Sequence, residues 1–390
     1  MIKSVKIENY KSIQSLEVDV GRFNVIIGEN GAGKSNFLEA LVLFGAAEAN
    51  KLDNEFLVSR GVRATLMVSQ FTQNIEAINL YISNQDNKSR STSLIYTQDH
   101  YPHQLTIKRN LVPDLSILNN DIRENIRNVI LQLPENIKEQ FIFTSEEKET
   151  LLNNMMIKLA KDVENINSYF YSIRQFILYS PENTALRNFY REGQIEPLGI
   201  NGEGLLKLLK VMQESEPTAF QDVLTCLELF DWFEQIDVPK DLTSLEDKVN
   251  IKDKYLSVMF DQRSANEGFL FVLFYAALFC SQYTPKIFAI DNIDASFNPK
   301  LCTAIIKKLV ELAKKYDKQV FVTTHNPAIL DGIDLGDEEQ KLFVASRNKQ
   351  GHTRFKTLTI ADKPKSSTGE PIRLSEAFLR GYLGGLPKNF

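Results

Sequence analysis

Apolar positions are spaced like strands near the N-terminus of the chain and like helices soon afterwards. Residues 1–45 predict a strand, a turn, a second strand, a glycine-rich loop and a helix. A short apolar run at 23–27 ends at Gly28, and apolar residues then recur at helical spacing at Phe37, Leu38, Leu41 and Phe44. Residues 64–71 and 77–82 predict further strands, and the polar stretch 86–93 predicts a hairpin loop.

The middle of the chain, residues 115–250, is predicted to be mostly helical. Apolar residues recur at intervals of about four from Leu151 to Ile177. This stripe is too short for a long coiled-coil arm and has no returning partner of equal length, so it favours a core-facing helix of a helical lobe.

From residue 265 the pattern alternates between helices and strands. It predicts helices at 268–279 and 301–316, and buried strands at 287–290 and 320–324. Near-continuous apolar strands separated by helices are typical of a mostly parallel sheet. The prediction is therefore an α/β fold in three segments: a first half-domain at 1–110, a helical lobe at 111–250 and a second half-domain at 251–390.

Composition excludes several classes of protein. The net charge of −5 gives no sign of nucleic-acid binding, although a local basic groove stays possible. Cys226, Cys280 and Cys302 form no C-x-x-C pair, which argues against a zinc site or a disulfide framework, and the last two lie in apolar helical patterns typical of a core. With no apolar run of 18 residues and no signal peptide, we expect a cytoplasmic protein without membrane contact.

The segment Gly28–Ser35, GENGAGKS, matches the phosphate-binding pattern G-x-x-x-x-G-K-[ST]. An apolar strand precedes it and a helix follows, as this motif requires. The glycines allow backbone N–H groups to approach phosphates, and the helix N-terminus adds a positive dipole. Lys34 is expected to reach the β- and γ-phosphates of a nucleotide, and Ser35 to ligate Mg²⁺.

A second phosphate-site signal lies in the last third of the chain. The apolar strand at 287–290 ends in Asp291, a position suited to a second Mg²⁺ ligand. The next strand ends in Thr323-Thr324-His325. Because ligands of open α/β sheets bind at the carboxyl ends of the strands, His325 is a candidate site residue.

These motifs resemble the RecF, SMC and OLD branch of ABC-type ATPases. The resemblance rests on 7–13, 28–40, 290–299 and 323–325, whereas 198–205 and 374–387 are similar to small AAA-type ATPases of bacterial defence loci. It implies that ATP and Mg²⁺ are the cofactors. It also implies that His325 senses the γ-phosphate, that Ser35 and Asp291 hold the metal, and that nucleotide is bound by Lys11, Asn30, Gly31, Gly33, Lys34, Ser35 and Asn36.

In this family a Ser-Gly signature element begins a helix and caps the γ-phosphate held by a second subunit. The matching place here is 264–268, with Ser264, Asn266 and Gly268 as candidates. A plain helix start is the competing interpretation, because Ser264 or Asn266 could simply cap the helix. The position between the helical lobe and Asp291 favours the signature.

Two departures from the family pattern concern hydrolysis. The usual catalytic base, a Glu after the metal-binding Asp, is replaced by Asn292, which cannot accept a proton at neutral pH. Asp294 could take its place or could be structural. No Gln marks the Q-loop clearly; Asn54 or Glu55 could substitute, and Gln70 is read as a strand residue.

The resemblance predicts an ATPase head that dimerises around ATP and Mg²⁺ and hydrolyses slowly. The first hypothesis is a sensor in bacterial anti-phage defence that controls a separately encoded effector such as a nuclease or toxin. The alternatives are a RecF-like repair ATPase acting on DNA and a non-hydrolysing, nucleotide-gated scaffold. A transporter ATPase is disfavoured, because the usual Leu-Ser-Gly-Gly-Gln signature is missing.

Overall fold

The computed structural model describes residues 1–63, 77–84, 89–97, 104–109, 172–188, 197–239, 248–365 and 372–386. By its contacts the chain divides into two compact units, one formed by Met1–Lys108 with Ile173–Phe390 and the other by Arg109–Ser172. Residues 173–250, expected in the helical lobe, therefore belong to the same unit as the two half-domains.

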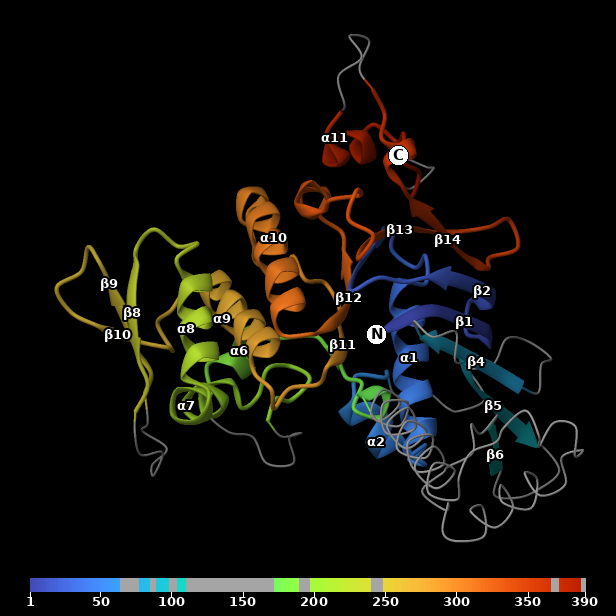
Figure 1. Cartoon of the computed structure of the whole chain (residues 1–390), viewed down its shortest axis with the longest axis horizontal. Helices are drawn as coiled ribbons and strands as arrows, with labels where there is room; N and C mark the ends of the chain where they lie inside the picture. The colour runs from blue at the N-terminus through green and yellow to red at the C-terminus, as the bar shows by residue number, and fades with distance from the viewer. Residues whose placement is uncertain are drawn as a thin grey trace, which may run out of the picture. The chain divides into compact units, whose positions relative to one another are not determined.

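A six-stranded sheet forms the centre of this unit (Figure 1). Its order is β14 (Thr353–Leu358), β13 (Gln340–Arg347), β3 (Phe23–Gly28), β12 (Gln319–Thr324), β11 (Ile287–Ile290) and β7 (Leu178–Tyr179). All neighbours are parallel except β13 and β14, which form an antiparallel hairpin. Strand β3, which lies near the start of the chain, is thus paired on both sides with strands from the C-terminal third.

The described residues form two further sheets. One has the order β2 (Ile13–Asp19), β1 (Ile2–Tyr10), β4 (Ala77–Asn84), β5 (Ser89–Thr97) and β6 (Gln104–Arg109). The other has the order β10 (Phe260–Asp261), β9 (Asn250–Asp253) and β8 (Phe233–Asp237). The predicted α/β fold with a mostly parallel central sheet is confirmed, and the β1–β2, β1–β4 and β4–β5 pairs add an antiparallel β part.

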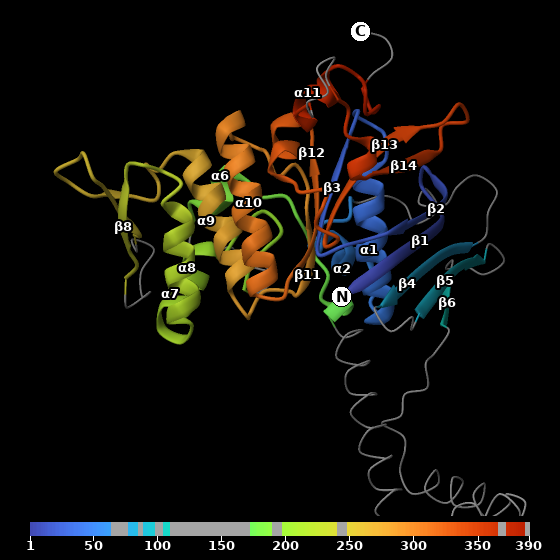
Figure 2. The same cartoon turned by 45° about the horizontal axis from the view of Figure 1, so that its top comes forward.

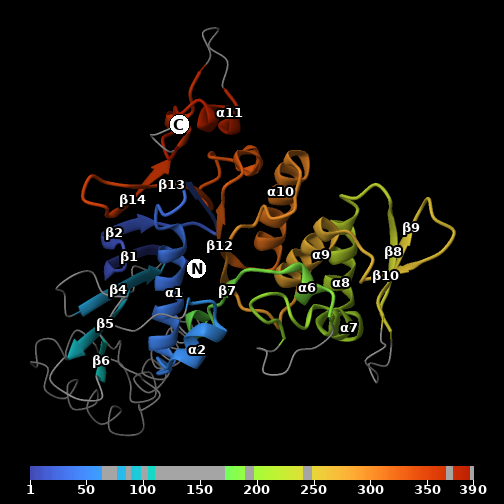
Figure 3. The same ribbon diagram turned by 180° about the vertical axis from the view of Figure 1, so that it is seen from behind.

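Helices cover both faces of the central sheet (Figures 2 and 3). On one face α1 (Lys34–Glu48) packs Phe37 against Phe321 of β12, with ring centroids 6.1 Å apart. On the other, Val320 and Val322 of the same strand join the core formed with α9 (Glu267–Cys280) and α10 (Pro299–Lys315). The period of two along β12 therefore divides its side chains between two apolar layers. In the part of the chain that the structure describes, the other helical segments are α2 (Asn54–Ser59), α6 (Asn183–Leu186), α7 (Leu205–Ser215), α8 (Pro217–Leu227), η4 (Pro327–Gly332), η5 (Ile360–Asp362) and α11 (Leu374–Leu379).

Helix α9 is apolar on every side and is buried throughout 269–280. A helix of this kind is stable only when it is surrounded by other elements. It contacts α6, α7, α8 and α10, which form its surroundings. All three cysteines are free and buried, which confirms the interpretation of Cys280 and Cys302 as core residues.

Two local predictions need correction. The polar stretch 86–93 is not all loop: β5 begins at Ser89 and pairs with β4, because the Thr, Ile and Tyr residues of this segment favour a strand. The apolar stripe is predicted to be helical as far as Ile177, but residues 175–177 are not helical and lead into β7. The segment 115–250, predicted to be mostly helical, also contains β8. Predictions for 64–71, Gln70 and all of 110–171 lie outside the described residues. Among the described helices, none has the length and apolarity needed to cross a membrane.

A buried lysine joins the end of α9 to β12. Lys318 is 2% exposed, and its ammonium donates to the carbonyl oxygens of Ser281, Thr284 and Pro285 and to Thr284 Oγ1, at 2.8–3.3 Å. Carbonyl oxygens at a helix C-terminus attract a cation. Burial nevertheless dominates and lowers the pKa of Lys318 to about 7.

Replacement Lys318→Met should change how stability depends on pH. The folded chain releases this proton near pH 7 and the unfolded chain near pH 10.5, so the folded state binds fewer protons between these values. The free energy of unfolding of the wild type should therefore rise from pH 7 to pH 8.5 relative to that of Lys318→Met. Urea unfolding at several pH values measures this, with Lys300→Met as an exposed control. Parallel curves for wild type and Lys318→Met would contradict the expectation.

Candidate functional site

The glycine-rich loop joins the end of β3 to the start of α1, as its sequence predicts. Gly31 and Gly33 have φ values of 77° and 99°, a region that favours glycine, and a Cβ at Gly33 would collide with Thr353 Oγ1. Lys34 is 6% exposed and donates to the carbonyl oxygens of Gly28 and Glu29 at 2.8 and 3.0 Å. Burial lowers the pKa of Lys34, while the negative charges of Asp291, Glu29 and Asp294 oppose this shift.

Ser35 and Asp291 meet at the carboxyl edge of the sheet. Ser35 Oγ donates to Asp291 Oδ2 at 3.1 Å, although 256 residues separate them. The Thr323 hydroxyl donates to the other carboxylate oxygen, Oδ1, and accepts from the backbone N–H of Asn292 at 2.9 Å. Thr323 therefore fixes the orientation of the Asp291 carboxylate.

Hard oxygen ligands of this kind suit Mg²⁺. This ion usually takes one or two protein oxygens and fills its remaining positions with water and substrate phosphates. Ser35 Oγ and Asp291 Oδ2 supply such a pair. Among the described residues no cluster of three His, Cys, Asp or Glu side chains is arranged to hold a metal ion.

Asn292 occupies an unusual backbone position. Its φ is 55°, in the left-handed region where Asn is tolerated much better than Glu. The residue is exposed. The local backbone therefore gives a physical reason for Asn at the place where the family pattern expects the base.

Asp294 is held against the end of β12. Its Oδ1 accepts from the Thr324 hydroxyl at 2.6 Å and from the backbone N–H of His325 at 3.4 Å.

Burial and the neighbouring Lys34 lower the pKa of His325, against the opposing charges of Asp294 and Asp291. A neutral imidazole is thus favoured, which can donate to a phosphate oxygen through only one of its two nitrogens.

The segment predicted as the signature element, 264–268, lies beside the loop 294–297 that follows Asp291. Asn266 Oδ1 accepts from the N–H of Phe269 at 2.7 Å and caps α9, so the plain capping role is present. Ser264 and Asn266 are exposed. A Cβ at Gly268 would lie 3.2 Å from the carbonyl oxygen of Ser296. The start of α9 and the loop 294–297 therefore form one continuous surface.

Arg187 holds the backbone of this segment through hydrogen bonds. Its guanidinium donates to the carbonyl oxygens of Gln262, Arg263 and Ala265, and its Nε donates to Asn183 Oδ1 at 2.8 Å. It follows α6 directly, which in turn follows β7 at the edge of the central sheet. Arg187 thus ties the signature loop to the strand beside β11.

The chain belongs to the AAA ATPase domain family. That family matches residues 1–330. The DNA replication and repair protein RecF of Exiguobacterium sp. is 37% identical over 51 residues, which is 13% of this chain and 14% of RecF. The ATP/GTP phosphatase of Helicobacter pylori is 34% identical over 71 residues, 18% of this chain and 19% of that protein. The chain thus matches less than a third of the length of these curated relatives.

The fold of this ATPase is that of an SMC head. A crystal structure of an SMC head bound to the C-terminal winged-helix domain of ScpA superposes with a TM-score of 0.54, covering 92% of this chain and 98% of the other at 13% identity. The predicted resemblance to RecF/SMC-like ATPases is confirmed.

Other predicted residues of this ATPase have different surroundings. Lys11 pairs with the buried carboxylate of Glu39, which also receives Arg63 Nε at 2.6 Å. Asn36 accepts from Arg63 Nη2 at 2.9 Å. Asn30 is exposed in the glycine-rich loop. Asn54 and Glu55, the Q-loop candidates, are exposed in the first turn of α2, and the structure gives neither a contact with Ser35 or Asp291.

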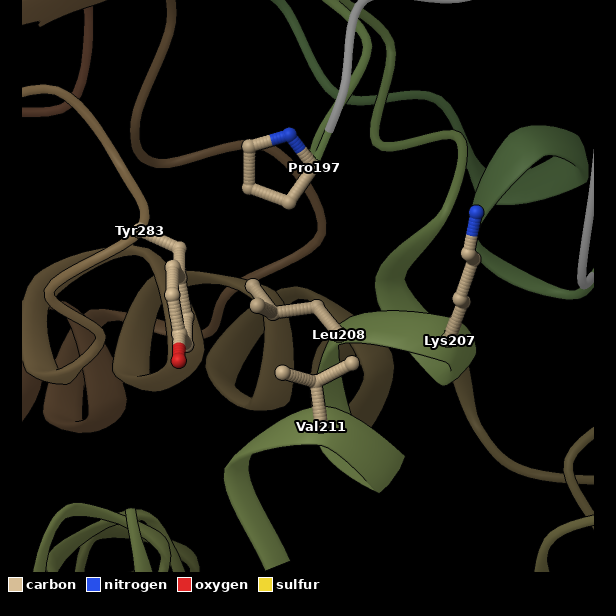
Figure 4. Close-up of a pocket in the computed structure, with 5 residues that line it drawn as sticks. All are labelled: Pro197, Lys207, Leu208, Val211 and Tyr283. Atoms are coloured by element: carbon tan, nitrogen blue, oxygen red, sulfur yellow. The ribbon is translucent and has the colours of Figure 1, made fainter. Parts of the chain in front are cut away.

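A pocket of about 300 Å³ lies away from these residues (Figure 4). It is lined by Pro197, Lys207, Leu208, Val211 and Tyr283. Its lining comes mainly from α7 and the loop after α9, not from the carboxyl ends of β3, β11 and β12. It is therefore not the candidate nucleotide site of this ATPase.

The two threonines that end β12 provide a matched test. Thr323 and Thr324 are both fully buried, and each donates to a different aspartate. Thr323→Val removes the donor to Asp291 Oδ1 and frees the carboxylate to rotate, so affinity for ATP in the presence of Mg²⁺ should fall about tenfold and affinity in EDTA should stay near wild type. Thr324→Val should keep Mg²⁺-dependent binding. Calorimetry with and without Mg²⁺ measures both. Equal losses in the two variants would contradict this division of roles.

Proposed function

We propose that this protein binds ATP with Mg²⁺ and closes as a homodimer around two nucleotides. The observation that carries the proposal is the 3.1 Å contact between Ser35 and Asp291, which joins the glycine-rich loop and the end of β11 at one sheet edge. An anion-binding loop next to a hard oxygen pair suits a nucleotide polyphosphate and Mg²⁺.

Each residue has a defined task in this proposal. Lys34 moves from the carbonyl oxygens of its own loop to the β- and γ-phosphates, while Ser35 and Asp291 ligate the metal. The metal, when bound, neutralises charge on the phosphates. His325 senses the γ-phosphate. Ser264, Asn266 and Gly268 cap the γ-phosphate held by the second copy.

Two features favour a dimer over a single closed subunit. Ser264 and Asn266 are exposed, and their hydrogen bonds go to Asp261 and Phe269 of their own segment. The adjacent loop 294–297 lies on the same surface. A second copy, related by a two-fold axis, could bring this surface to the glycine-rich loop in both directions at once. ATP then drives closure because it binds the closed state better.

We propose that hydrolysis is slow. The Helicobacter pylori relative is an ATP/GTP phosphatase by name, which supports nucleotide turnover by this chain. Asn292 cannot act as a base, and its left-handed backbone disfavours the usual Glu. Asp294, held by Thr324 and the N–H of His325, is the carboxylate placed to orient or deprotonate water.

The cellular role stays a prediction from resemblance. We propose a cytoplasmic sensor of bacterial anti-phage defence that controls a separate nuclease or toxin through its nucleotide state. The names of the RecF relatives keep a repair function on DNA as the alternative. The neighbouring gene separates the two, since an effector gene supports defence and replication genes support repair.

Ser264→Arg should block dimerisation driven by ATP. It adds bulk and charge at an exposed position, whereas a Cβ at Gly268 would already lie 3.2 Å from the carbonyl oxygen of Ser296 and require that loop to shift. ATP binding to the single subunit should persist. Light scattering with and without ATP gives the mass, with Ser215→Arg on the exposed end of α7 as the matched control and Lys34→Ala as the binding-deficient reference. Normal closure by Ser264→Arg would refute the signature assignment.

Asp294→Asn should lower turnover by about 100-fold, the typical contribution of a positioned base. The wild type should already turn over below about 10 per second. Asn292→Glu should change the rate mildly or raise it, and His325→Ala should abolish the response to ATP. Steady-state phosphate release measures the turnover of the wild type and of the three variants. Fast wild-type turnover that survives Asp294→Asn would show that another group is the base.

A further inference from the structure

The hairpin β13–β14 grips the glycine-rich loop from the C-terminal end of the chain. Arg347 and Thr353 face each other as the last pair of the hairpin register. Arg347 Nε donates to the carbonyl oxygen of Gly31 at 2.6 Å, and Thr353 Oγ1 donates to that of Ala32 at 2.9 Å. Two facing residues thus hold two successive carbonyl groups of a loop more than 300 residues away.

These bonds fix which way the loop peptides point. In a planar trans peptide the C=O and the following N–H point in opposite directions. With the Ala32 carbonyl held by Thr353, the N–H of Gly33 faces away from the hairpin. With the Gly31 carbonyl held by Arg347, the N–H of Ala32 also points away from that carbonyl, and it donates to the carbonyl oxygen of Glu29 at 3.3 Å within the loop. The N–H of Gly33 is therefore the donor that these bonds turn away from the hairpin, and backbone N–H groups presented in this way by a glycine-rich loop bind anions.

The Thr353 hydroxyl is itself held by a directed chain of hydrogen bonds. Arg63 Nη2 donates to Asn36 Oδ1 at 2.9 Å, and Asn36 Nδ2 donates to Ser12 Oγ at 2.7 Å. Ser12 Oγ lies 2.7 Å from Thr353 Oγ1. Because the single proton of Thr353 goes to Ala32, Ser12 must donate to Thr353, so every bond runs the same way. Aligned bonds of this kind strengthen one another.

Thr353 lies in a tightly packed site. The residue is fully buried, and its backbone N–H donates to the Ser12 carbonyl oxygen at 2.8 Å. A Cβ at position 33 would collide with its hydroxyl oxygen, so the loop can approach the hairpin this closely only with glycine there. Arg347, by contrast, is exposed and also donates to the Gly351 carbonyl oxygen at 2.9 Å.

We propose that Arg347 and Thr353 are positioning residues that orient the phosphate-binding N–H groups of the loop before nucleotide arrives. The chain from Arg63 through Asn36 and Ser12 holds the Thr353 hydroxyl in the donating direction. This inference rests on the proposed binding of ATP. It adds that two segments far from the loop in sequence, the hairpin β13–β14 and the residues after α2, determine how strongly the loop binds phosphate.

Thr353→Val tests the proposal because it keeps the branched shape and removes only the hydroxyl. Affinities for ATP and ADP with Mg²⁺ should both fall about tenfold, while turnover at saturating ATP stays within about threefold of wild type. Thr353→Ser should restore binding. Thr357→Val, on an exposed position of the same strand, is the control. Calorimetry and steady-state kinetics give the two readouts. Wild-type affinity in Thr353→Val, or a loss in kcat without a loss in affinity, would overturn the proposal.

Arg347 provides a second test at an exposed position, where replacement leaves the core intact. Arg347→Met should weaken ATP and ADP binding equally, and Arg347→Lys should recover little, because Lys cannot reproduce a guanidinium donor placed at both carbonyl groups. Arg354→Met is the exposed control on the same hairpin. Full recovery by Arg347→Lys would show a charge effect and overturn positioning. If the wild type itself fails to bind ATP, the proposed function fails, whereas wild-type binding that no hairpin variant changes refutes this inference alone.

Discussion

The parallel register of β3, β12 and β11 is the constraint on which the candidate site depends. Ile27 of β3 lies opposite Thr324, and Ile290 of β11 lies opposite Val322. The three strands therefore end at one edge, which places Ser35 and Asp291 within hydrogen-bonding distance and Asp294 against Thr324. A shift of one residue would reverse the side-chain faces of a strand and separate these groups. The apolar layers on both sides of β12 prevent such a shift.

The sequence indicated those features whose signal is local. Apolar runs ending in Gly28, Asp291 and His325 predicted the strands and the edge, because a buried parallel strand must be almost wholly apolar. Strand β7 was missed, since two residues give no period and the preceding apolar stripe looked helical. The roles of Thr323 and Thr353 were equally invisible. Each depends on a partner distant along the chain, and a threonine in a strand is ordinary.

The start of α9 and the loop 294–297 are packed tightly against each other. Phe297 packs edge-on against Phe271 and Tyr275 of α9, with ring centroids 6.3 and 6.1 Å apart. Arg187 anchors the approach to α9 through three carbonyl groups. Movement of one segment must therefore displace the other. Because the loop begins three residues after Asp291, the candidate site and this exposed face are joined by a short, well-packed segment.

The position of β3 between β12 and β13 also has a consequence for protein synthesis. Phe23 pairs with Gln340, more than 300 residues later. At a translation rate of roughly 5–20 residues per second, an apolar strand made early waits roughly 15–60 s for its neighbours. During that interval both edges of β3 are open to wrong partners. Timely folding of this protein on the ribosome therefore depends on shielding a segment that already carries the glycine-rich loop.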